Sequence, residues 1–509
     1  MRLKHVRILL AIICFAIITF FFIDFAGLFP QEYFTLAKIQ IVPALLSGSL
    51  IIVGVLLLLT LILGRIYCSV ICPFGIFQDI VTWIRKRFKP KMKYKYSKEK
   101  KFWRFGILAL VLVTYFAGLT VVLSVLEPYS AFGRILTNLF RPVYMFGNNL
   151  ITSVFNHFGN YTFYNAEIFI QSISALVVSV LTLLIVVYMA ARYGRTWCNT
   201  ICPVGTVLGY LSKISFLKIH IDESSCNSCG KCEKSCKSSC IDSKNNKIDY
   251  SRCVVCYDCI PTCKTKSISY KFSLTQGKKA DSKTNIKDAS KRRFLGTLAA
   301  TTLVAPVASI AQTVSNIKPH TSYKKEYPLS PPGSGSIEHL LEKCTACHLC
   351  IAKCPSKVLK PAFMEYGLGG IMQPRMYFDN GFCNYDCTIC STVCPNDALI
   401  DLTMEQKHSL QMGRVIFVLS NCVVYTDGTR CGACSEHCPT QAVRMVPYKN
   451  GLTIPETDPD ICVGCGGCEY ICPAVPVKAI YVEGNPVHLQ AKPFVEEAKK
   501  EIQIEGFGF

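Results

Sequence analysis

The sequence predicts a multidomain protein in which an α-helical membrane bundle carries two small, cysteine-rich α+β domains. Three observations lead to this fold class. The chain has 509 residues, which is too long for a single hydrophobic core. Half of its residues are hydrophobic and only 17% are charged, as in a membrane protein. Twenty-four of its 30 cysteines fall into six groups of four, a pattern that indicates metal clusters and not a disulfide framework.

The formal net charge of +21 is unevenly distributed. Residues 312–509 hold 17 of the 55 Lys+Arg and 20 of the 34 Asp+Glu, a net charge of −3, so residues 1–311 carry +24. The basic clusters flank apolar segments, as the positive-inside rule predicts for cytoplasmic loops. Nucleic acid is therefore not expected as a partner, whereas membrane lipid is expected as one.

The first predicted domain, residues 1–214, contains four apolar runs at 8–29, 41–63, 105–126 and 168–190. Each is close to the 20 or so residues that a membrane-spanning helix needs. The basic N-terminus and the basic loop between the second and third runs should be cytoplasmic. The loop 127–167 should then lie outside, and the fourth helix returns the chain to the cytoplasm.

A sequence repeat marks the cytoplasmic ends of the second and fourth runs. Residues 64–75 and 194–205 both read G-R-x-aromatic-C-x3-C-P-x-G, which indicates a duplicated two-helix unit. Cysteines four apart share one helix face, so Cys68 with Cys72 and Cys198 with Cys202 can form thiol pairs. Two interpretations stay open: the thiols only pack, or they have a redox or metal role where the copies meet.

The second predicted domain, residues 215–272, holds two copies of C-x2-C-x2-C-x3-C, the pattern of two-cluster ferredoxins. In that pattern each fourth cysteine binds the other cluster, and soft thiolates suit iron. We assign Cys226, Cys229, Cys232 and Cys263 to one [4Fe-4S] cluster, and Cys253, Cys256, Cys259 and Cys236 to the other. Lys237 and Lys264 replace the usual proline, Cys240 could replace Cys236, and a structural zinc site is the alternative.

These features of residues 1–270 together resemble the NapH-type membrane quinol dehydrogenases. The resemblance rests on the four spans, the two C-x3-C-P copies and the ferredoxin-like tail. It implies a quinol substrate and the quinone pool of a bacterial inner membrane, with the first ferredoxin-like domain in the cytoplasm.

Residues 290–311 separate the two halves of the chain. A basic start, SKRRFLG, precedes a small-residue apolar run, as in an export signal of the twin-arginine type, and a fifth transmembrane helix is the alternative. Polar linkers are predicted on either side, at 273–289 and 312–336. Either interpretation moves the second half across a membrane.

The last predicted domain, residues 337–509, carries four cysteine motifs and hence four more [4Fe-4S] clusters, six in all. Its ligand candidates are Cys344, Cys347, Cys350 and Cys354, then Cys383, Cys387, Cys390 and Cys394, then Cys422, Cys431, Cys434 and Cys438, and finally Cys462, Cys465, Cys468 and Cys472. The outer motifs are regular and the inner two are stretched, which favours nested pairing of the first with the fourth and the second with the third. Sequential pairing is the alternative. Cys344 to His348 also matches the C-x-x-C-H haem motif, but the continuing cysteines favour a cluster.

This half resembles the periplasmic NapG and MauM ferredoxins, from Pro331-Pro332-Gly333 through the C-x8-C-x2-C-x3-C-P motif. The whole chain therefore resembles a NapH-type protein fused to a NapG-type protein. The resemblance implies that electrons pass from quinol through the clusters to a periplasmic reductase or a small cytochrome, with nitrate reductase as the family's usual acceptor.

Two other functions are compatible with the sequence. The chain could maintain or reactivate a partner metalloenzyme, or it could carry electrons from a cytoplasmic ferredoxin. No catalytic triad, phosphate loop or dinucleotide motif stands out. Leu126 to Tyr129, in the predicted outer loop, is the candidate for the quinol site.

Overall fold

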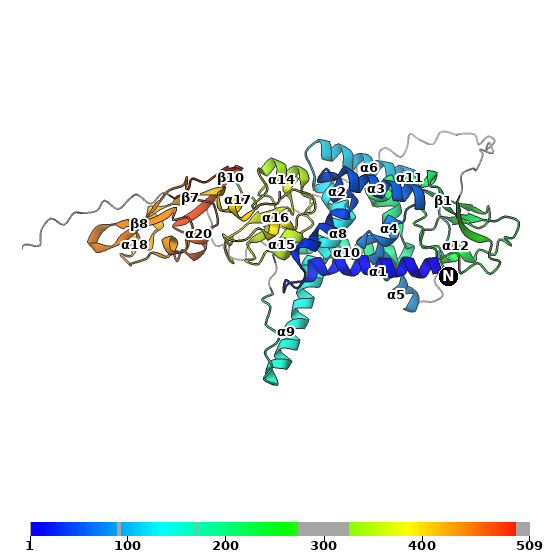
Figure 1. The fold of residues 1–509 in the computed structure, drawn as a ribbon, viewed down its shortest axis with the longest axis horizontal. Helices are drawn as coiled ribbons and strands as arrows, with labels where there is room; N and C mark the ends of the chain where they lie inside the picture. The colour runs from blue at the N-terminus through cyan, green and yellow to red at the C-terminus, as the bar shows by residue number, and fades with distance from the viewer. Residues whose placement is uncertain (1, 89–92, 169–170, 273–324, 495–509) are drawn as a thin grey trace, which may run out of the picture.

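A helical domain lies between two cysteine-rich domains at opposite ends of an elongated molecule (Figure 1). The computed structural model describes residues 2–88, 93–168, 171–272 and 325–494. We call residues 2–214 the helical domain, 215–272 the first cysteine-rich domain and 325–494 the second. The predicted linker 273–289 and the predicted signal or fifth span at 290–311 lie outside the described residues.

Only two of the four predicted membrane runs form single helices long and apolar enough to cross a membrane. They are α1 (Arg2–Ile23) and α10 (Ile173–Tyr193). The second run divides into α2 (Ile41–Leu46) and α3 (Leu50–Leu63), and the third into α6 (Lys101–Phe116) and α7 (Val121–Leu126). Gly48 and Gly118 stand at the two breaks with φ of 73° and 77°, a left-handed conformation that ends a helix. The prediction of unbroken helices there was wrong.

The predicted outer loop 127–167 is mostly helical. It contains α8 (Pro128–Ile135), a π-helical turn η2 (Leu136–Phe140) and α9 (Arg141–His157), which projects sideways from the long axis in Figure 1. The other short elements of this domain are η1 (Gln31–Ile39), α4 (Tyr67–Val70), α5 (Pro73–Phe88), η3 (Trp197–Ile201), α11 (Pro203–Leu211) and η4 (Ser212–Ile214).

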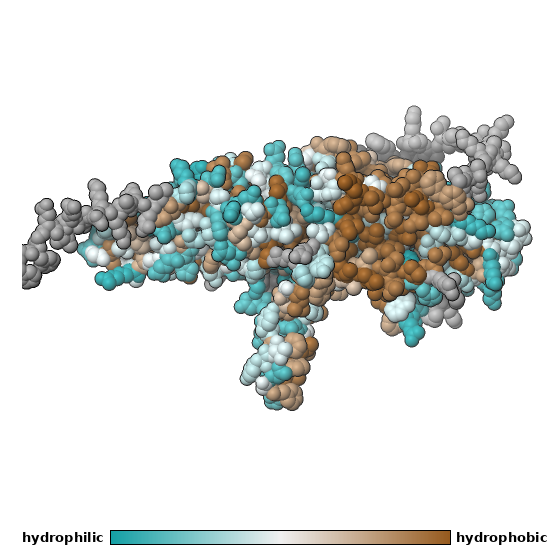
Figure 2. All heavy atoms as spheres, in the orientation of Figure 1, coloured by the Kyte–Doolittle hydropathy of each residue, from teal (hydrophilic) through white to brown (hydrophobic). Residues whose placement is uncertain are grey.

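Exposed apolar side chains gather on the helical domain in a zone that we call the apolar belt. Figure 2 shows this belt as a brown band between the more polar ends of the molecule. It includes Ile51 and Phe116, each 84% exposed, and Leu184, 60% exposed. A patch of this size on a soluble protein would be unfavourable in water.

The first cysteine-rich domain is a small α+β unit. β1 (Leu217–Ile221) pairs antiparallel with β4 (Ile268–Phe272), and β2 (Ile241–Asp242) pairs with β3 (Lys247–Ile248). One short helix, α12 (Lys231–Ser235), follows the first cysteine loop. Ile219, Ile221, Ile241 and Ile268 form the core together with the cysteines.

The second cysteine-rich domain contains three two-stranded antiparallel sheets. β5 (Leu359–Pro361) pairs with β6 (Pro374–Met376), β8 (Val443–Pro447) with β9 (Thr453–Thr457), and β7 (Leu410–Phe417) with β10 (Ile480–Gln490). The helical elements are α14 (Ile337–Lys343), α15 (Leu349–Lys353), η6 (Leu368–Gly370), α16 (Ile389–Thr392), α17 (Met404–His408), η7 (Leu419–Asn421), α18 (Val423–Thr426), α19 (Ala433–Glu436), η8 (Lys449–Gly451) and α20 (Gly467–Ile471).

The end of the predicted linker 312–336 belongs to this fold. Ser330 and Ser334 are fully buried, and Ser336 forms a β-bridge with Val487. The Pro- and Gly-rich composition indicated a flexible segment, but its small side chains pack closely against β10.

Candidate functional site

The four regular cysteine motifs share one backbone conformation. The second and fourth residues after each first cysteine have positive φ: Ser228 and Gly230, Val255 and Tyr257, Ala346 and His348, Gly464 and Gly466. Alternation of this kind turns successive backbone N–H groups toward one point and forms a nest for negative charge. The cysteine spacing of the motif therefore positions both the thiols of a site and the N–H donors that surround them.

In the first cysteine-rich domain the thiols meet as the spacing predicted. Cys226, Cys229, Cys232 and Cys263 line one hollow, and Cys236, Cys253, Cys256 and Cys259 line the other. Cys240 lies in the second hollow as well, with its Sγ 3.5 Å from the Cys236 Sγ. The hydrogen bond between these two thiols lowers the pKa of Cys236. The C-x3-C spacing assigns Cys236 as the ligand, with Cys240 beside it.

In the second cysteine-rich domain the motifs pair sequentially, so the nested pairing was wrong. Cys344, Cys347 and Cys350 meet Cys394 of the second motif, and Cys422, Cys431 and Cys434 meet Cys472 of the fourth. By their mutual electrostatic influence, Cys383, Cys387 and Cys390 group with Cys354, and Cys462, Cys465 and Cys468 group with Cys438.

Two local hairpins explain the sequential pairing. β5–β6 lies between the first and second motifs, and β8–β9 lies between the third and fourth. Each hairpin brings neighbouring motifs together by closing a short loop, which loses less entropy than the long closure that nested pairing needs. The stretched first ligands, on which nested pairing rested, are local insertions: α18 occupies the longer one, between Cys422 and Cys431.

The four sites form a row that begins at the helical domain. The row runs from the Cys344 site to the Cys383 site, then to the Cys462 site and last to the Cys422 site. A backbone hydrogen bond of 2.9 Å from Cys383 N–H to Cys465 O joins the second site to the third. Figure 1 shows α15 and α16 near the helical domain and α18 far from it.

The residues around these sites fit [4Fe-4S] clusters. Each site gathers four thiols in a mostly buried hollow, and backbone N–H groups donate to sulfur at 3.3–3.4 Å. The donor–acceptor pairs are Ala346 to Cys344, Leu399 to Cys394, Gly464 to Cys462 and Ala479 to Cys472. Such bonds and the degree of burial set the potential at which a cluster accepts an electron.

The Cys344 site packs directly on α8. Arg134 donates to Ala346 O at 3.1 Å, and the Ser130 hydroxyl lies 2.8 Å from the Thr345 hydroxyl. A Cβ on Gly133 would lie only 2.5 Å from Cys347 O, so only glycine permits this approach. The first site of the row thus touches the helical domain through backbone atoms of its own cysteine loop.

This contact fills the segment that the sequence suggested for quinol. Tyr129 is fully buried, and the Glu127 carboxylate caps α8 by accepting from the Tyr129 and Ser130 N–H groups. Leu126 to Tyr129 therefore lie at the docking interface of the second cysteine-rich domain, and a quinol site in that segment stays a prediction.

His348, the residue that completes the haem-like motif, is bonded on both sides of its ring. Its Nε2 lies 3.0 Å from Met372 O and its Nδ1 lies 3.3 Å from Asn138 Nδ2. Burial, together with Arg134, lowers its pKa to about 3. The ring is neutral and links the cysteine loop to η2.

The first cysteine-rich domain docks at the other end through a buried ion network. The Asp79 carboxylate of α5 accepts from Arg195 at 2.7 Å, Lys237 at 2.8 Å and Arg7 at 3.1 Å. Lys237 also reaches Asp258 at 3.2 Å. No sequence pattern indicated Asp79, and Lys237, which replaces the usual proline, was the available signal.

The repeated motif forms a reciprocal pair in space. Arg65 of the first copy donates to Cys198 O of the second at 3.2 Å, and Arg195 of the second donates to Cys68 O of the first. A Cβ on Gly75 or Gly205 would lie 2.3 or 2.1 Å from these same carbonyl oxygens. The arginine and the second glycine of the motif therefore have a packing explanation.

The motif thiols lie at this junction and are buried. Cys72 is near enough to Cys68, Cys198 and Cys202 to interact with them electrostatically. The second cysteine of a copy also caps a helix, since Cys202 Sγ accepts the Gly205 N–H at 3.3 Å and Pro203 begins α11. A redox or metal role for the four thiols stays a prediction.

Comparison with family models finds iron–sulfur proteins. A model described as a 4Fe-4S binding domain matches residues 47–91 and 174–221, which contain the two C-x3-C-P copies. A 4Fe-4S dicluster domain matches residues 429–475. No solved structure matches the chain.

Several relatives carry ferredoxin-type names. Ferredoxin-type protein NapF of Escherichia coli K12 is 27% identical over 31% of this chain and 87% of its own length. NapG of the same strain is 30% identical over 28% of this chain and 65% of its own length. The methylamine utilization ferredoxin-type protein MauN of Methylobacillus flagellatus is 27% identical over 38% of this chain and 53% of its own length.

These findings support a ferredoxin-like iron–sulfur protein that is similar to the NapG and MauM ferredoxins, as the sequence predicted. The NapH-type fusion stays a prediction.

Proposed function

We propose that this chain is a membrane-bound electron-transfer protein that takes electrons from quinol and delivers them through [4Fe-4S] clusters to a redox partner outside a bacterial inner membrane. The observation that carries the proposal is the row of four thiol sites that starts on the helical domain and runs away from it. A row of four cysteine sites, the second and third joined by the backbone hydrogen bond from Cys383 to Cys465, provides a route for single electrons between a membrane and a soluble partner.

The apolar belt supports the membrane placement. It covers the middle of the molecule, and the cysteine-rich domains lie beyond it on either side (Figure 2). In Figure 1 the first cysteine-rich domain, which ends at residue 272, and the second, which begins at residue 325, lie at opposite ends of the helical domain, and the predicted span at 290–311 falls between them in the sequence. A membrane crossing between them would produce this placement, with the −3 half outside and the +24 half inside.

The far end of the row is the proposed docking place for a periplasmic reductase or a small cytochrome. The Cys422 site lies there, and Cys431 and Cys438 near it are half-buried, in contrast to the buried Cys344. Less protein then separates this site from solvent, which suits electron exchange with a partner that binds transiently.

Electron paramagnetic resonance tests this function. In the full chain in lipid nanodiscs, prepared anaerobically, reduced menaquinone analogue should produce reduced-cluster signals, and dithionite should define the maximum. Signals with dithionite and none with quinol would contradict the quinol part of the proposal.

A second test concerns orientation. In spheroplasts, protease added from outside should cut the second cysteine-rich domain and leave the first intact. Protection of residues 325–494 would contradict the periplasmic placement.

An electron path fed by a cytoplasmic ferredoxin is the second candidate. The exposed thiol of Cys229 favours it, because this places the Cys226 site within reach of a soluble donor at the other end of the molecule. Reduction of the clusters by added reduced ferredoxin, faster than by quinol, would select this alternative.

A further inference from the structure

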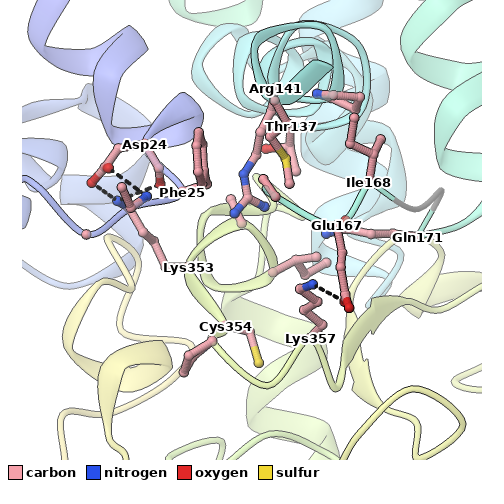
Figure 3. Close-up of a pocket in the computed structure, with 18 of the residues that line it drawn as sticks. Asp24, Phe25, Thr137, Arg141, Glu167, Ile168, Gln171, Lys353, Cys354 and Lys357 are labelled. Carbon is pink, nitrogen blue, oxygen red and sulfur yellow. Dashed lines mark hydrogen bonds and ion pairs between the residues drawn. The ribbon is translucent and has the colours of Figure 1, made fainter. Parts of the chain in front are cut away.

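A cavity of about 570 Å³ lies where the helical domain meets the second cysteine-rich domain. Its walls come from the end of α1, the start of α9 and α10, and α15 with the residues that follow it. Cys354, the fourth ligand candidate of the Cys383 site, lies in its wall. Figure 3 shows Arg141 between two ion pairs, Asp24 with Lys353 and Glu167 with Lys357, and above Cys354.

We infer that this cavity binds the hydroquinone head group of a membrane quinol. This deepens the proposed function and rests on it for the fate of the electrons. The cavity volume suits one substituted aromatic ring.

The polar groups of the cavity match a hydroquinone. Within the described part of the chain, Arg141 Nε, Gln171 Oε1 and Thr137 Oγ1 are buried and have no hydrogen-bond partner. Arg141 Nε can only donate and Gln171 Oε1 can only accept. A hydroquinone hydroxyl both donates and accepts, so it satisfies both residues, and an ionised phosphate leaves the Gln171 oxygen unpaired.

The remaining lining is apolar and continues to the lipid. Phe25, Met145 and Leu176 line the cavity, and α9, which starts at Arg141, exposes Phe146 and Leu150 beyond it. Figure 2 shows α9 with an apolar side toward the brown band and a paler side away from it. Such a helix lies in the membrane interface, so a lipid-soluble molecule can reach the cavity without crossing water.

The oxidation of a bound hydroquinone is balanced by groups beside the cavity. Oxidation of hydroquinone to quinone breaks two O–H bonds and releases two protons and two electrons. Glu167, 87% exposed, stands between the cavity and outside water and can receive protons. The electrons leave singly toward the Cys354 side of the cavity, where the proposed acceptors lie.

Binding of a quinol analogue tests the site directly. The full chain in nanodiscs of phosphatidylethanolamine and phosphatidylglycerol would be titrated with 2-heptyl-4-hydroxyquinoline N-oxide, whose fluorescence is quenched on binding. Gln171→Leu and Arg141→Gln should each raise the dissociation constant about tenfold or more, since each leaves a cavity group or a ligand group unpaired. Gln171→Glu keeps the acceptor and should bind like the native chain.

Matched controls separate this result from misfolding and from lipid binding. Arg192→Gln, at the exposed end of α10, should not change binding, and iron content should stay equal in all variants. Unchanged binding in both cavity variants would overturn the site. Tighter binding of the analogue once phosphatidylglycerol is omitted would also overturn it, because a phospholipid head group would then be the occupant.

The same variants distinguish the site from the proposed function. If the analogue binds and the variants weaken it, but menaquinol does not reduce the clusters, the site stands and the electron path fails. If menaquinol reduces the clusters equally in native and variant chains, the path stands and the site is overturned.

Discussion

The two cysteine-rich domains dock on one helical domain by different means. The first is held by buried charge, with three cations gathered on the Asp79 carboxylate. The second is held by separate contacts: Arg134 donates to Ala346 O, the Ser130 hydroxyl meets the Thr345 hydroxyl, and the ion pairs Asp24–Lys353 (2.7 Å), Lys38–Asp397 and Glu167–Lys357 share no residue. Loss of the one carboxylate that several buried cations share is more damaging than loss of one separate hydrogen bond. The two interfaces should therefore respond very differently to single substitutions.

The largest effect is expected at the charged interface. Although burial opposes it, Arg195 and Lys237 hold the pKa of Asp79 well below its usual range, so the carboxylate is ionised in the native protein. Asp79→Asn would leave Arg195 buried without a carboxylate partner and Lys237 with Asp258 alone, which should destabilise the domain contact by about 3–5 kcal/mol. Limited proteolysis of the first cysteine-rich domain and thermal unfolding would measure it.

Asp460→Asn is the control for this substitution. Asp460 pairs with Lys492 at 2.7 Å, but both side chains are more than half exposed. Surface pairs contribute little, so this variant should unfold and resist protease like the native chain. Equal behaviour of the Asp79 and Asp460 variants would remove the distinction between the two interfaces.

A steric substitution tests the interface of the second cysteine-rich domain with α8. In Gly133→Ala the new Cβ would meet Cys347 O at 2.5 Å and the Phe22 ring at 2.7 Å, which should force the Cys344 site away from α8. Overpacking of this kind typically destabilises by about 1–3 kcal/mol. Iron content should be kept, and reduction of the clusters by quinol should slow.

Gly147→Ala is the matched control, because its Cβ would have no heavy atom within 4 Å on α9. It should leave quinol-dependent reduction unchanged. If Gly133→Ala behaves in the same way, the contact between α8 and the cysteine loop has no part in electron entry.

The same comparison explains what the sequence could predict. In the first cysteine-rich domain, the local cysteine spacing predicts which four thiols form each site. The loops with positive φ bring those thiols together. The helix breaks at Gly48 and Gly118 were not predicted, because apolar composition alone does not indicate where the backbone adopts a positive φ. Asp79 and Gln171 depend on contacts between distant segments, which a single sequence does not reveal. The sequential pairing depends on the hairpins β5–β6 and β8–β9, which the cysteine spacing alone does not indicate.

The duplicated thiols should show a smaller effect. Replacing Cys68, Cys72, Cys198 and Cys202 together with serine should preserve the helix cap at Gly205, since a hydroxyl also accepts an N–H. We expect the ferredoxin-type sites to keep their iron and quinol-dependent reduction to continue. Loss of reduction with unchanged iron would instead assign these thiols the redox role that the repeat suggested.

The smallest change in iron content is expected for substitution of Cys240, and it tests which thiol binds iron in the first cysteine-rich domain. Six four-thiol sites predict about 24 iron atoms per chain, four for each cluster. Because the C-x3-C spacing assigns Cys236 and not Cys240 as the fourth ligand of the Cys253 site, Cys236→Ser should lose about four iron atoms and Cys240→Ser should lose none. In Cys240→Ser the serine hydroxyl can still donate to the Cys236 sulfur, so the reduction potential of that cluster should move little. Iron and sulfide analysis with a redox titration would measure both variants. An iron loss confined to Cys240→Ser would make Cys240 the ligand and Cys236 its donor, and the regular C-x3-C spacing would then not identify the fourth thiolate of this site.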